Sequence, residues 1–177
     1  MTIITKKGDR GTTLTFAGEE ISKTDPLIAL NGAIDGLNAQ VGFARSMLVE
    51  ASLLKIAREL KGLQAVLFRL GAEIQGATGH VVSKRDVEDV EKLIMAHESA
   101  FELPRFFITP GAMPASAAMD FARAVARRVE REAIAVAEKG VAVSDHARVW
   151  LNRVSDYLFV AARAAENEAG VEFETGE

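Results

Sequence analysis

Four arginines and one glutamate lie close together in the second half of the chain, in the run from Phe106 to Arg131. The run begins with two aromatic residues, turns at Pro110-Gly111, and continues in a pattern typical of a helix. Arg128 points away from the other charged groups of that helix. The remaining four fall within an arc of about 100°: Arg123, Arg127, Glu130 and Arg131.

Guanidinium groups on one helix face repel each other unless something neutralises them, and Glu130 does so only in part. A phosphate chain is one natural counterion, because guanidinium forks match phosphate oxygens two at a time. The other interpretation is a salt-bridge network between helices, in which Asp35 or Asp156 supplies the opposite charge. Spacing alone leaves both interpretations open.

The N-terminal segment offers a second place for phosphate. Residues 1–23 are rich in Gly, Thr and charge and show no helical period, which predicts a loop or an irregular hairpin. Backbone amides and hydroxyls beside Lys6 and Lys7 could cradle a phosphate. The pattern is not a Walker A motif, and a flexible surface arm is the alternative interpretation.

Other catalytic chemistry lacks the residues it needs. The chain has no cysteine, which excludes disulfides, thiolate metal sites and Cys nucleophiles. The three histidines are scattered without ligand spacing, and the carboxylates do not form the repeated E-x-x-H pattern of di-iron bundles. No serine lies in a nucleophile-elbow pattern. We therefore predict neither a metal site built by the protein nor a protein nucleophile.

Five amphipathic helices are expected to position these groups. Asp25, Ser83 and Ser144 are candidate N-caps, and Ser83 forms a capping-box pattern with Asp86. The periodic apolar positions predict helices over about 26–48, 52–75, 83–99, 114–139 and 144–167. The predicted fold class is all-α: one domain over 1–177, with an N-terminal arm (1–24), a five-helix bundle (25–168) and a frayed polar tail (169–177).

Polar residues also follow the edge of the first helix. Asn31, Asp35 and Asn38 recur there at helical spacing, beside the apolar seam. Half-buried polar groups need partners, which must come from inside the bundle or from another subunit. A solvated flank is the alternative interpretation of the same pattern.

Composition limits the partners. The 177 residues carry a net charge of −4, which argues against general nucleic-acid binding. The N-terminus has no secretory h-region, and no apolar run approaches the roughly 18 residues that cross a bilayer. We expect a cytoplasmic protein with no nucleic-acid or membrane partner.

Several motifs together resemble the PduO-type ATP:cob(I)alamin adenosyltransferases. They are ITKKGDRGTT at the start, I-D-x-L-N in the first helix, F-x-x-x-P-G followed by RAVARRVER, and LNRVSDYLFVAAR in the last helix. They occur in order and span nearly the whole chain. The resemblance implies a five-helix bundle that assembles as a homotrimer, with active sites between adjacent subunits.

The resemblance also implies a reaction. Co(I) of the substrate, cob(I)alamin, attacks the 5′ carbon of ATP, forms adenosylcobalamin and releases inorganic triphosphate. The nucleophile belongs to the substrate, so the protein has to orient the reactants and stabilise the leaving group. Mg²⁺ accompanies the triphosphate, and a reduced flavin or flavoprotein supplies the electron for reduction.

Site residues follow from the resemblance position by position. The ATP-binding loop corresponds to Thr5, Lys6, Lys7, Gly8, Thr13, Leu14 and Lys23. The nucleotide contacts of the last two helices correspond to Arg127, Arg128, Glu130, Arg131 and Asn152. Arg123 pairs with Asp35 across the subunit interface, and Phe107 matches the aromatic residue that displaces the lower axial ligand of cobalamin.

Some positions depart from the family pattern: Lys7, Glu20, Gly36, Ala112, Met113 and Asp120. The phosphate-contact residues are retained, so we expect ATP binding. The changes at Met113 and Asp120 fall near the corrinoid side, where they could alter substrate choice. Two alternatives to the enzyme are a non-catalytic homologue that binds ATP or adenosylcobalamin for sensing or delivery, and a structural oligomer with salt-bridged arginines.

Overall fold

The computed structural model describes residues 4, 6 and 8–175. A small antiparallel hairpin comes first, with β1 (Thr12–Leu14) paired to β2 (Glu20–Ser22). The helices that follow are α1 (Pro26–Glu50), α2 (Leu54–Ile74), α3 (Lys84–Glu98), α4 (Pro114–Ala137) and α5 (Asp145–Ala169). The predicted all-α fold with an irregular N-terminal arm is confirmed, and the helix ends differ from expectation by a few residues.

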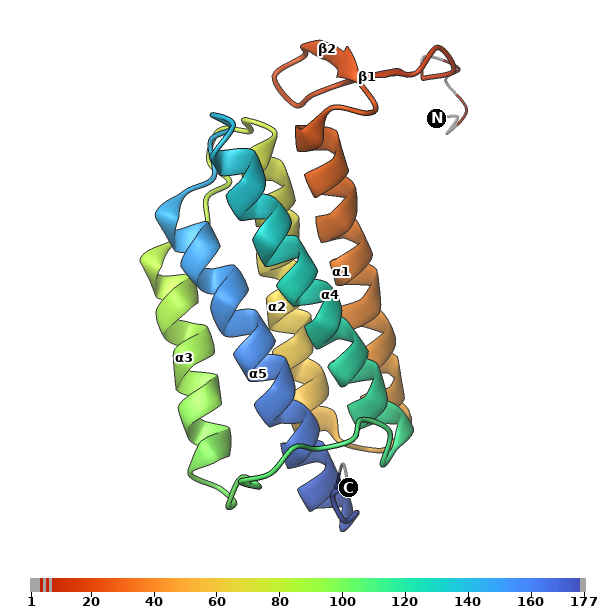
Figure 1. Cartoon of the computed structure of the whole chain (residues 1–177), viewed down its shortest axis with the longest axis vertical. Helices are drawn as coiled ribbons and strands as arrows, with labels where there is room; N and C mark the ends of the chain where they lie inside the picture. Colours follow the sequence, from red (N-terminus) through yellow and green to blue (C-terminus); the bar gives the residue numbers. More distant parts are fainter. Residues whose placement is uncertain (1–3, 5, 7, 176–177) are drawn as a thin grey trace.

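The helices run alternately up and down a single bundle (Figure 1). α4 packs between α1 and α5, α2 packs on α1, and α3 lies outside on α5. The hairpin lies beyond the N-terminal end of α1, whereas the loop of residues 99–113 crosses the opposite end from α3 to α4 (Figure 1). α4 therefore extends between the end that carries the hairpin and the end that carries Phe107.

The three predicted N-caps are confirmed. A carboxylate oxygen of Asp25 accepts from the backbone N–H of Leu27 at 2.8 Å, and Pro26 occupies the first turn of α1. Ser83 and Asp86 form a reciprocal capping box on α3. Ser144 caps α5 in the same way as Asp25 caps α1. Local sequence thus determines where these helices begin.

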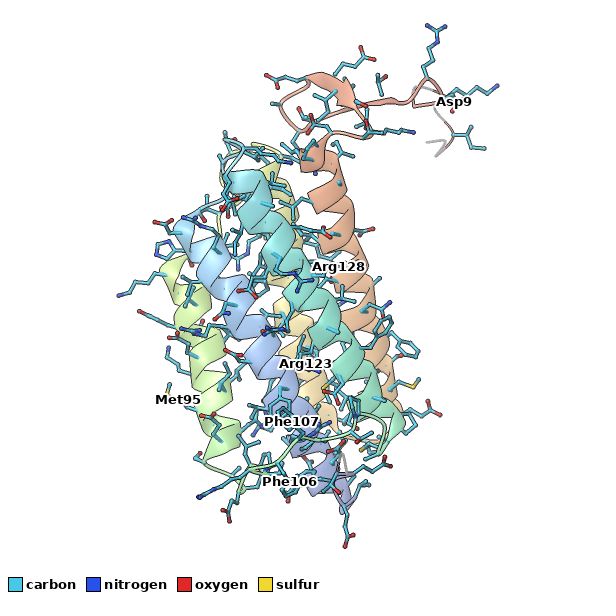
Figure 2. All side chains as sticks on the ribbon, in the orientation of Figure 1. Asp9, Met95, Phe106, Phe107, Arg123 and Arg128 are labelled. Atoms are coloured by element: carbon cyan, nitrogen blue, oxygen red, sulfur yellow. The ribbon has the colours of Figure 1, made fainter. Side chains whose placement is uncertain are left out.

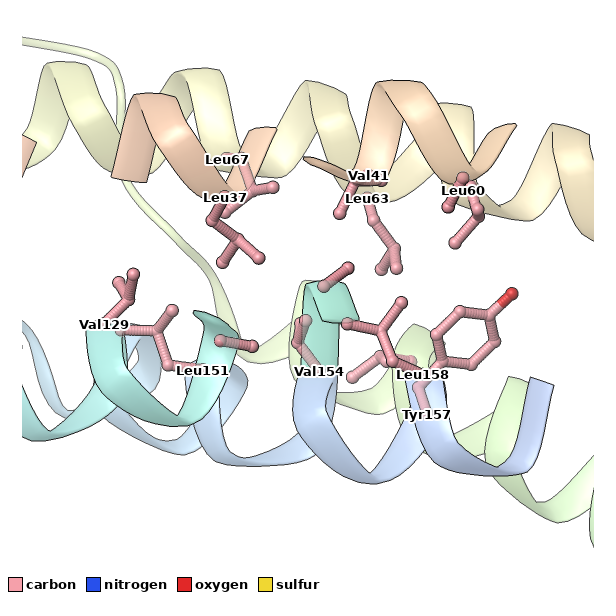
Figure 3. Packing of buried hydrophobic residues seen from close by; sticks show 14 of the residues in the cluster. Leu37, Val41, Leu60, Leu63, Leu67, Val129, Leu151, Val154, Tyr157 and Leu158 are labelled. Carbon is pink, nitrogen blue, oxygen red and sulfur yellow. The ribbon is translucent and has the colours of Figure 1, made fainter. Parts of the chain in front are cut away.

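Buried aliphatic side chains from all five helices form the core, part of which is drawn in Figure 3. Leucines of α1 and α2, such as Leu37 and Leu67, face Val129 of α4 and Leu151 of α5. α4 and α5 pack on each other, and both helices bury alanines such as Ala122 and Ala161, whose small side chains favour close packing of helices. Within the described residues, no helix is long and apolar enough to cross a membrane.

One polar cluster ties three helices together inside the bundle. Glu59 of α2 accepts hydrogen bonds from Nε2 of His97 on α3, at 2.7 Å, and from the hydroxyl of Tyr157 on α5, at 2.8 Å. Burial raises the pKa of Glu59, but the two hydrogen bonds together with nearby charge hold this pKa below the usual 4.5. Burial and the Glu59 carboxylate raise the pKa of Tyr157 well above 10.

The C-terminal segment up to Thr175 pairs with another part of the chain, which differs from the frayed tail expected from its polar sequence. The backbone N–H of Thr109 donates to the carbonyl of Glu174 at 2.9 Å, and Ile108 forms a bridge with Thr175. Gly170 adopts a left-handed conformation (φ 68°) that turns the chain after α5. The segment after α5 therefore holds the loop that carries Phe107, a long-range pairing that composition cannot reveal.

Candidate active site

A hollow of about 570 Å³ lies between α3, α4 and α5, next to the loop that leads into α4. We call it the arginine hollow, because Arg123, Arg127 and Arg153 line it. Apart from Ser155, its other lining residues are acidic or apolar: Glu91, Ile94, Met95, Glu98, Leu103, Asp156, Phe159 and Val160. Arg153 is paired with Glu91 and Asp156, so Arg123 and Arg127 are the arginines of the hollow that could meet the anionic end of a ligand, beside an apolar surface.

Arg123 is held from within its own chain. Its Nε donates to a carboxylate oxygen of Asp120 at 3.4 Å, one turn earlier on α4. The salt-bridge interpretation named Asp35 or Asp156 as the acid, and for a single chain that assignment is wrong. Asp156 lies 3.8 Å from Arg153 instead, and Asp35 lines a different hollow.

The other arginines of α4 differ in their surroundings. Arg127 is exposed and faces the arginine hollow. Nη1 of Arg131 donates to the backbone carbonyl of Arg127 at 3.1 Å. Arg128 lies 3.6 Å from Glu132 and does not line the hollow, so its side chain diverges from the shared face as helical geometry predicted.

Asn152 of α5 is held at both ends of its amide group. Its Nδ2 donates to Glu130 of α4 at 2.9 Å, and its Oδ1 accepts from Nη1 of Arg153 at 2.6 Å. Arg153 in turn donates through Nε to Glu91 of α3 at 2.9 Å. This chain of bonds links three helices and orients Asn152 beside the arginine face, by which we mean the face of α4 that carries Arg123, Arg127 and Arg131.

The hairpin forms a second hollow, of about 780 Å³. It brings together Lys6, Gly8, Thr13, Leu14 and Lys23, which the sequence had assigned to the ATP-binding loop, and adds Arg10, Thr12 and Glu20. Thr5 and Lys7, the other two predicted members, lie outside the described residues. Nζ of Lys23 lies 2.8 Å from the place that a side chain on Gly8 would occupy, so this cation closely approaches the backbone there. Backbone amides, hydroxyls and cations in one concave surface can bind phosphate.

Asp35 of α1, another predicted site residue, lines neither the arginine hollow nor the hollow of the hairpin. It is exposed, not half-buried as expected, and it lines a hollow of about 300 Å³ between α1 and α2. Asn38 lines the same hollow and is 6% exposed, and its Oδ1 has no hydrogen-bond partner within the described part of the chain. Asp35 and Arg123 therefore belong to different surfaces of one chain.

Phe107 stands at the lower end of α4. Figure 2 shows Phe106 and Phe107 in the loop below α4, with Arg123 and then Arg128 further up the helix. The side chain of Phe107 is 92% exposed, which is unusual for an aromatic ring because it leaves a large apolar surface in water. The order from loop to hairpin is therefore an aromatic group, the arginine face, and the hollow of the hairpin.

Sequence reasoning missed several residues that shape this surface. Arg153, Glu91 and Phe159 line the arginine hollow, and Asp120 with Arg163 forms a buried pair behind it. The i, i+3 spacing of Arg163 and Glu166 was a local signal for an ion pair. Nothing local connects Arg163 with Asp120, 43 positions earlier, because that contact depends on how α4 packs against α5.

The fold and these surfaces define a class: a helical bundle with an arginine-bearing face on α4, an exposed aromatic residue near one end and a hollow lined by lysine, threonine and glycine in the N-terminal hairpin at the other. A family model described as cobalamin adenosyltransferase matches residues 3–165. The chain therefore belongs to the cobalamin adenosyltransferase family, as its motifs predicted.

Individual relatives agree with this assignment. The chain is 35% identical over 175 residues to a corrinoid adenosyltransferase of Citrobacter freundii, with 96% of this chain and 97% of the relative covered. It is 32% identical over 177 residues to the corrinoid adenosyltransferase MMAB of Mus musculus, with coverages of 95% and 74%. A variant PduO-type ATP:corrinoid adenosyltransferase from Lactobacillus reuteri, complexed with cobalamin and ATP, has a similar structure. The TM-score is 0.90 at 26% identity, covering 99% of this chain and 97% of that one.

Proposed function

We propose that the protein transfers the 5′-deoxyadenosyl group of ATP to Co(I) of a reduced corrinoid, giving adenosylcobalamin and triphosphate. The observation that carries the proposal is the order of surfaces along α4, from exposed Phe107 through the arginine hollow toward the hairpin. A corrinoid ring fits the apolar end and a triphosphate fits the cationic end. The family of the chain and the ligands of its structural neighbour support the same reading.

In the proposed reaction, cobalt donates an electron pair to the 5′ carbon as the bond from that carbon to oxygen breaks. The triphosphate leaves with the electrons of the broken bond. Arg127 and Arg131 would stabilise the charge that develops on the leaving group, since charge-assisted bonds from guanidinium groups to phosphate are strong. Arg128 would contribute if a phosphate reaches around α4. Asn152 and Glu130, already bonded to each other, would position the nucleoside.

The hairpin would hold the phosphates through Lys6, Gly8, Thr13 and Lys23, with Leu14 beside the nucleoside. Thr5 and Lys7 stay predictions for the same loop. The hollow of the hairpin is lined, among described residues, by the N-terminal segment alone, and the arginine hollow by α3, α4, α5 and a loop residue. Two separate half-sites in one chain are what we expect if each active site forms between adjacent subunits.

We propose that these subunits form a homotrimer in which Asp35 of one chain pairs with Arg123 of the next. Asp35 and Arg123 line different hollows, so a head-to-tail contact could bring them together and close into a ring. The unpartnered Oδ1 of Asn38, beside Asp35, would gain a donor from the neighbouring chain. The cytoplasmic location stays a prediction from the sequence.

Mg²⁺ fits this site as a companion of the nucleotide. Within the described residues, no group of three His, Asp or Glu side chains could hold a metal ion. Mg²⁺ usually binds through one or two carboxylates plus substrate phosphates. The triphosphate would therefore supply most of the ligands, and bound Mg²⁺ would neutralise part of its charge.

The departures at Met113 and Asp120 do not obstruct the corrinoid end. Met113 is partly buried against the core, where it precedes the first residue of α4. Asp120 faces the interior and pairs with Arg163. Neither side chain occupies the arginine hollow, which favours the enzyme over a relative that only binds ATP or adenosylcobalamin.

The direct test is an anaerobic assay with ATP, Mg²⁺ and chemically reduced cobalamin. We expect loss of the Co(I) absorption band together with formation of adenosylcobalamin and triphosphate in equal amounts. Binding of ATP by calorimetry without any adenosylcobalamin would refute the enzyme and leave a binding protein. Absence of ATP binding would leave only an oligomer with salt-bridged arginines.

Phe107→Ala separates the two stages of corrinoid handling. If Phe107 displaces the lower axial ligand, it makes Co(II) easier to reduce and matters less once Co(I) is supplied. We expect a larger loss of turnover with Co(II) and a reduced flavin than with chemically prepared Co(I). Phe106→Ala, in the same exposed loop, is the matched control. Equal losses in the two assays would contradict the assigned role.

A further inference from the structure

A cluster of buried charges lies behind the arginine hollow. Nη2 of Arg163 on α5 donates to a carboxylate oxygen of Asp120 on α4 at 2.6 Å. Nε of Arg163 lies 2.9 Å from Glu166, one turn further along α5. The side chains of Asp120, Arg163 and Glu166 are 3%, 1% and 1% exposed, so water does not screen them.

This cluster contains two carboxylates and one guanidinium group, and it needs a second cation. A buried charge without a partner is strongly destabilising. Arg123 supplies the missing charge, because its Nε donates to the second oxygen of Asp120 at 3.4 Å. The two oxygens of Asp120 thus serve two arginines, one buried inside the bundle and one at the hollow.

The bond to Asp120 determines how Arg123 is presented. The Arg123 side chain is 31% exposed and lines the arginine hollow, whereas its anchor is buried. Because Nε of Arg123 is bonded to Asp120, the two terminal nitrogens of Arg123 remain available to a ligand or to a neighbouring chain. Arg127 lines the same hollow, but no such buried carboxylate holds it within the described residues.

We propose that Asp120 is a positioning residue, which orients Arg123 from within its own subunit before ligand or a neighbouring chain arrives. The proposal rests on the adenosyltransferase function and deepens it. Asp120 is one of the positions at which the sequence departs from the motifs of the family it resembles. Arg163, itself bonded to Glu166, holds the carboxylate of Asp120 in place, and the bond from Arg123 to the other oxygen of Asp120 restricts the orientation of Arg123.

A double-mutant cycle tests whether Asp120 acts through Arg123. Asp120→Asn preserves shape and leaves the Arg163–Glu166 pair intact, but an amide has one acceptor oxygen for two arginines. We expect kcat/KM to fall about tenfold in Asp120→Asn, the scale of one lost charge-assisted bond. In an Arg123→Ala background the same change should cost less than about twofold. Equal losses in both backgrounds would mean a purely structural role and overturn the proposal.

Two further variants exclude a general loss of order. Asp120→Glu, which restores the charge, should recover part of the lost kcat/KM. Asp86→Asn removes the charge from another aspartate–arginine pair, with Arg69, which does not line the arginine hollow. It should lower the melting temperature without changing the dependence of activity on Arg123. Failure of Asp120→Glu to recover any activity would count against the proposal.

A readout without turnover keeps this inference separate from the adenosyltransferase assay. The Nε–H proton of Arg123 can be followed by NMR and assigned with Arg123→Lys. We expect slow solvent exchange in the unmodified protein and markedly faster exchange in Asp120→Asn. Unchanged exchange would overturn the positioning role even in an active enzyme. Slow exchange in a protein that forms no adenosylcobalamin would instead refute the proposed function alone.

Discussion

At the scale of single residues, identical side chains on α4 have different environments. Asp120 anchors Arg123, whereas Arg127 is exposed at the hollow and Arg128 lies near Glu132. Nη1 of Arg131 reaches back to the carbonyl of Arg127. A free guanidinium group can reorganise around a phosphate at little cost, so Arg127 is the best placed of the four to bind the leaving group.

Replacing Arg127 tests that assignment. Arg127→Ala should weaken use of ATP by about 1.5–3 kcal/mol, the range for a hydrogen bond to a charged group. The measurement is kcat and KM for ATP at saturating cob(I)alamin. Arg148→Ala removes an exposed arginine that pairs with Asp145 at the start of α5 and serves as the control. Unchanged kinetic constants in Arg127→Ala would remove this residue from the site.

At the scale of elements, hydrogen bonds and ion pairs between side chains fix the relative positions of helices, in addition to apolar packing. Glu59 joins α2 to α3 and α5, and Arg153 joins α5 to α3 through Glu91. α3 packs mainly on α5, so these ties determine its place at the edge of the bundle. Because α3 forms one wall of the arginine hollow, its position affects the width of that hollow.

The Glu59 tie should respond to acid. The folded pKa of Glu59 lies below 4.5, so the ionised carboxylate stabilises the fold above that pH and the contribution is lost as pH falls. Glu59→Gln should therefore lower stability near neutral pH by about 1–3 kcal/mol. Its melting temperature should also fall less steeply than that of the unmodified protein as pH decreases from 5 toward 3.

The comparison needs a glutamate that has no such partners. Glu50→Gln, at the exposed end of α1, makes the same chemical change and should leave the acid dependence unaltered. Thermal unfolding of the three proteins across this pH range provides the measurement. Parallel curves for Glu59→Gln and the unmodified protein would show that the Glu59 tie contributes no acid sensitivity.

At the scale of the whole molecule, the site of one chain is divided. The hairpin hollow and the arginine hollow lie apart along the bundle, and Asp35 lines a third surface between α1 and α2. A heterologous contact that repeats around a three-fold axis would complete each site with residues of a neighbour. Assembly and activity should then fail together.

Asp35→Ala tests that link. We expect weaker trimers and loss of adenosyltransferase activity, because Arg123 would lose its partner in the neighbouring subunit. Molecular mass by light scattering over a range of protein concentrations, with activity measured on the same samples, follows both effects. Asp89→Ala, which removes an exposed aspartate of α3, is the control. A fully active trimer of Asp35→Ala would refute the pairing.

The sequence by itself predicted the five helices and the N-terminal ends of three of them. Apolar periodicity and the caps Asp25, Ser83 and Ser144 are local signals, because each cap bonds a backbone N–H only two or three residues further along the chain. The spacing on α4 also placed Arg123 and Arg127 together and set Arg128 apart, since a helix converts sequence separation directly into angle. Both interpretations of the arginine face remained open at that stage.

Only the tertiary structure decided which polar groups from different elements meet. Asp120 meets Arg163 from 43 positions away, Glu59 meets Tyr157 from 98, and Thr109 meets Glu174 across the lower end of the bundle. These pairs depend on which helices pack together and in what register, which no local pattern specifies. Asp120, the acid that holds Arg123, lies one turn earlier on the same helix, a spacing that is visible in the sequence. The packing of α4 on α5 decided that Asp120 would be buried and would also pair with Arg163.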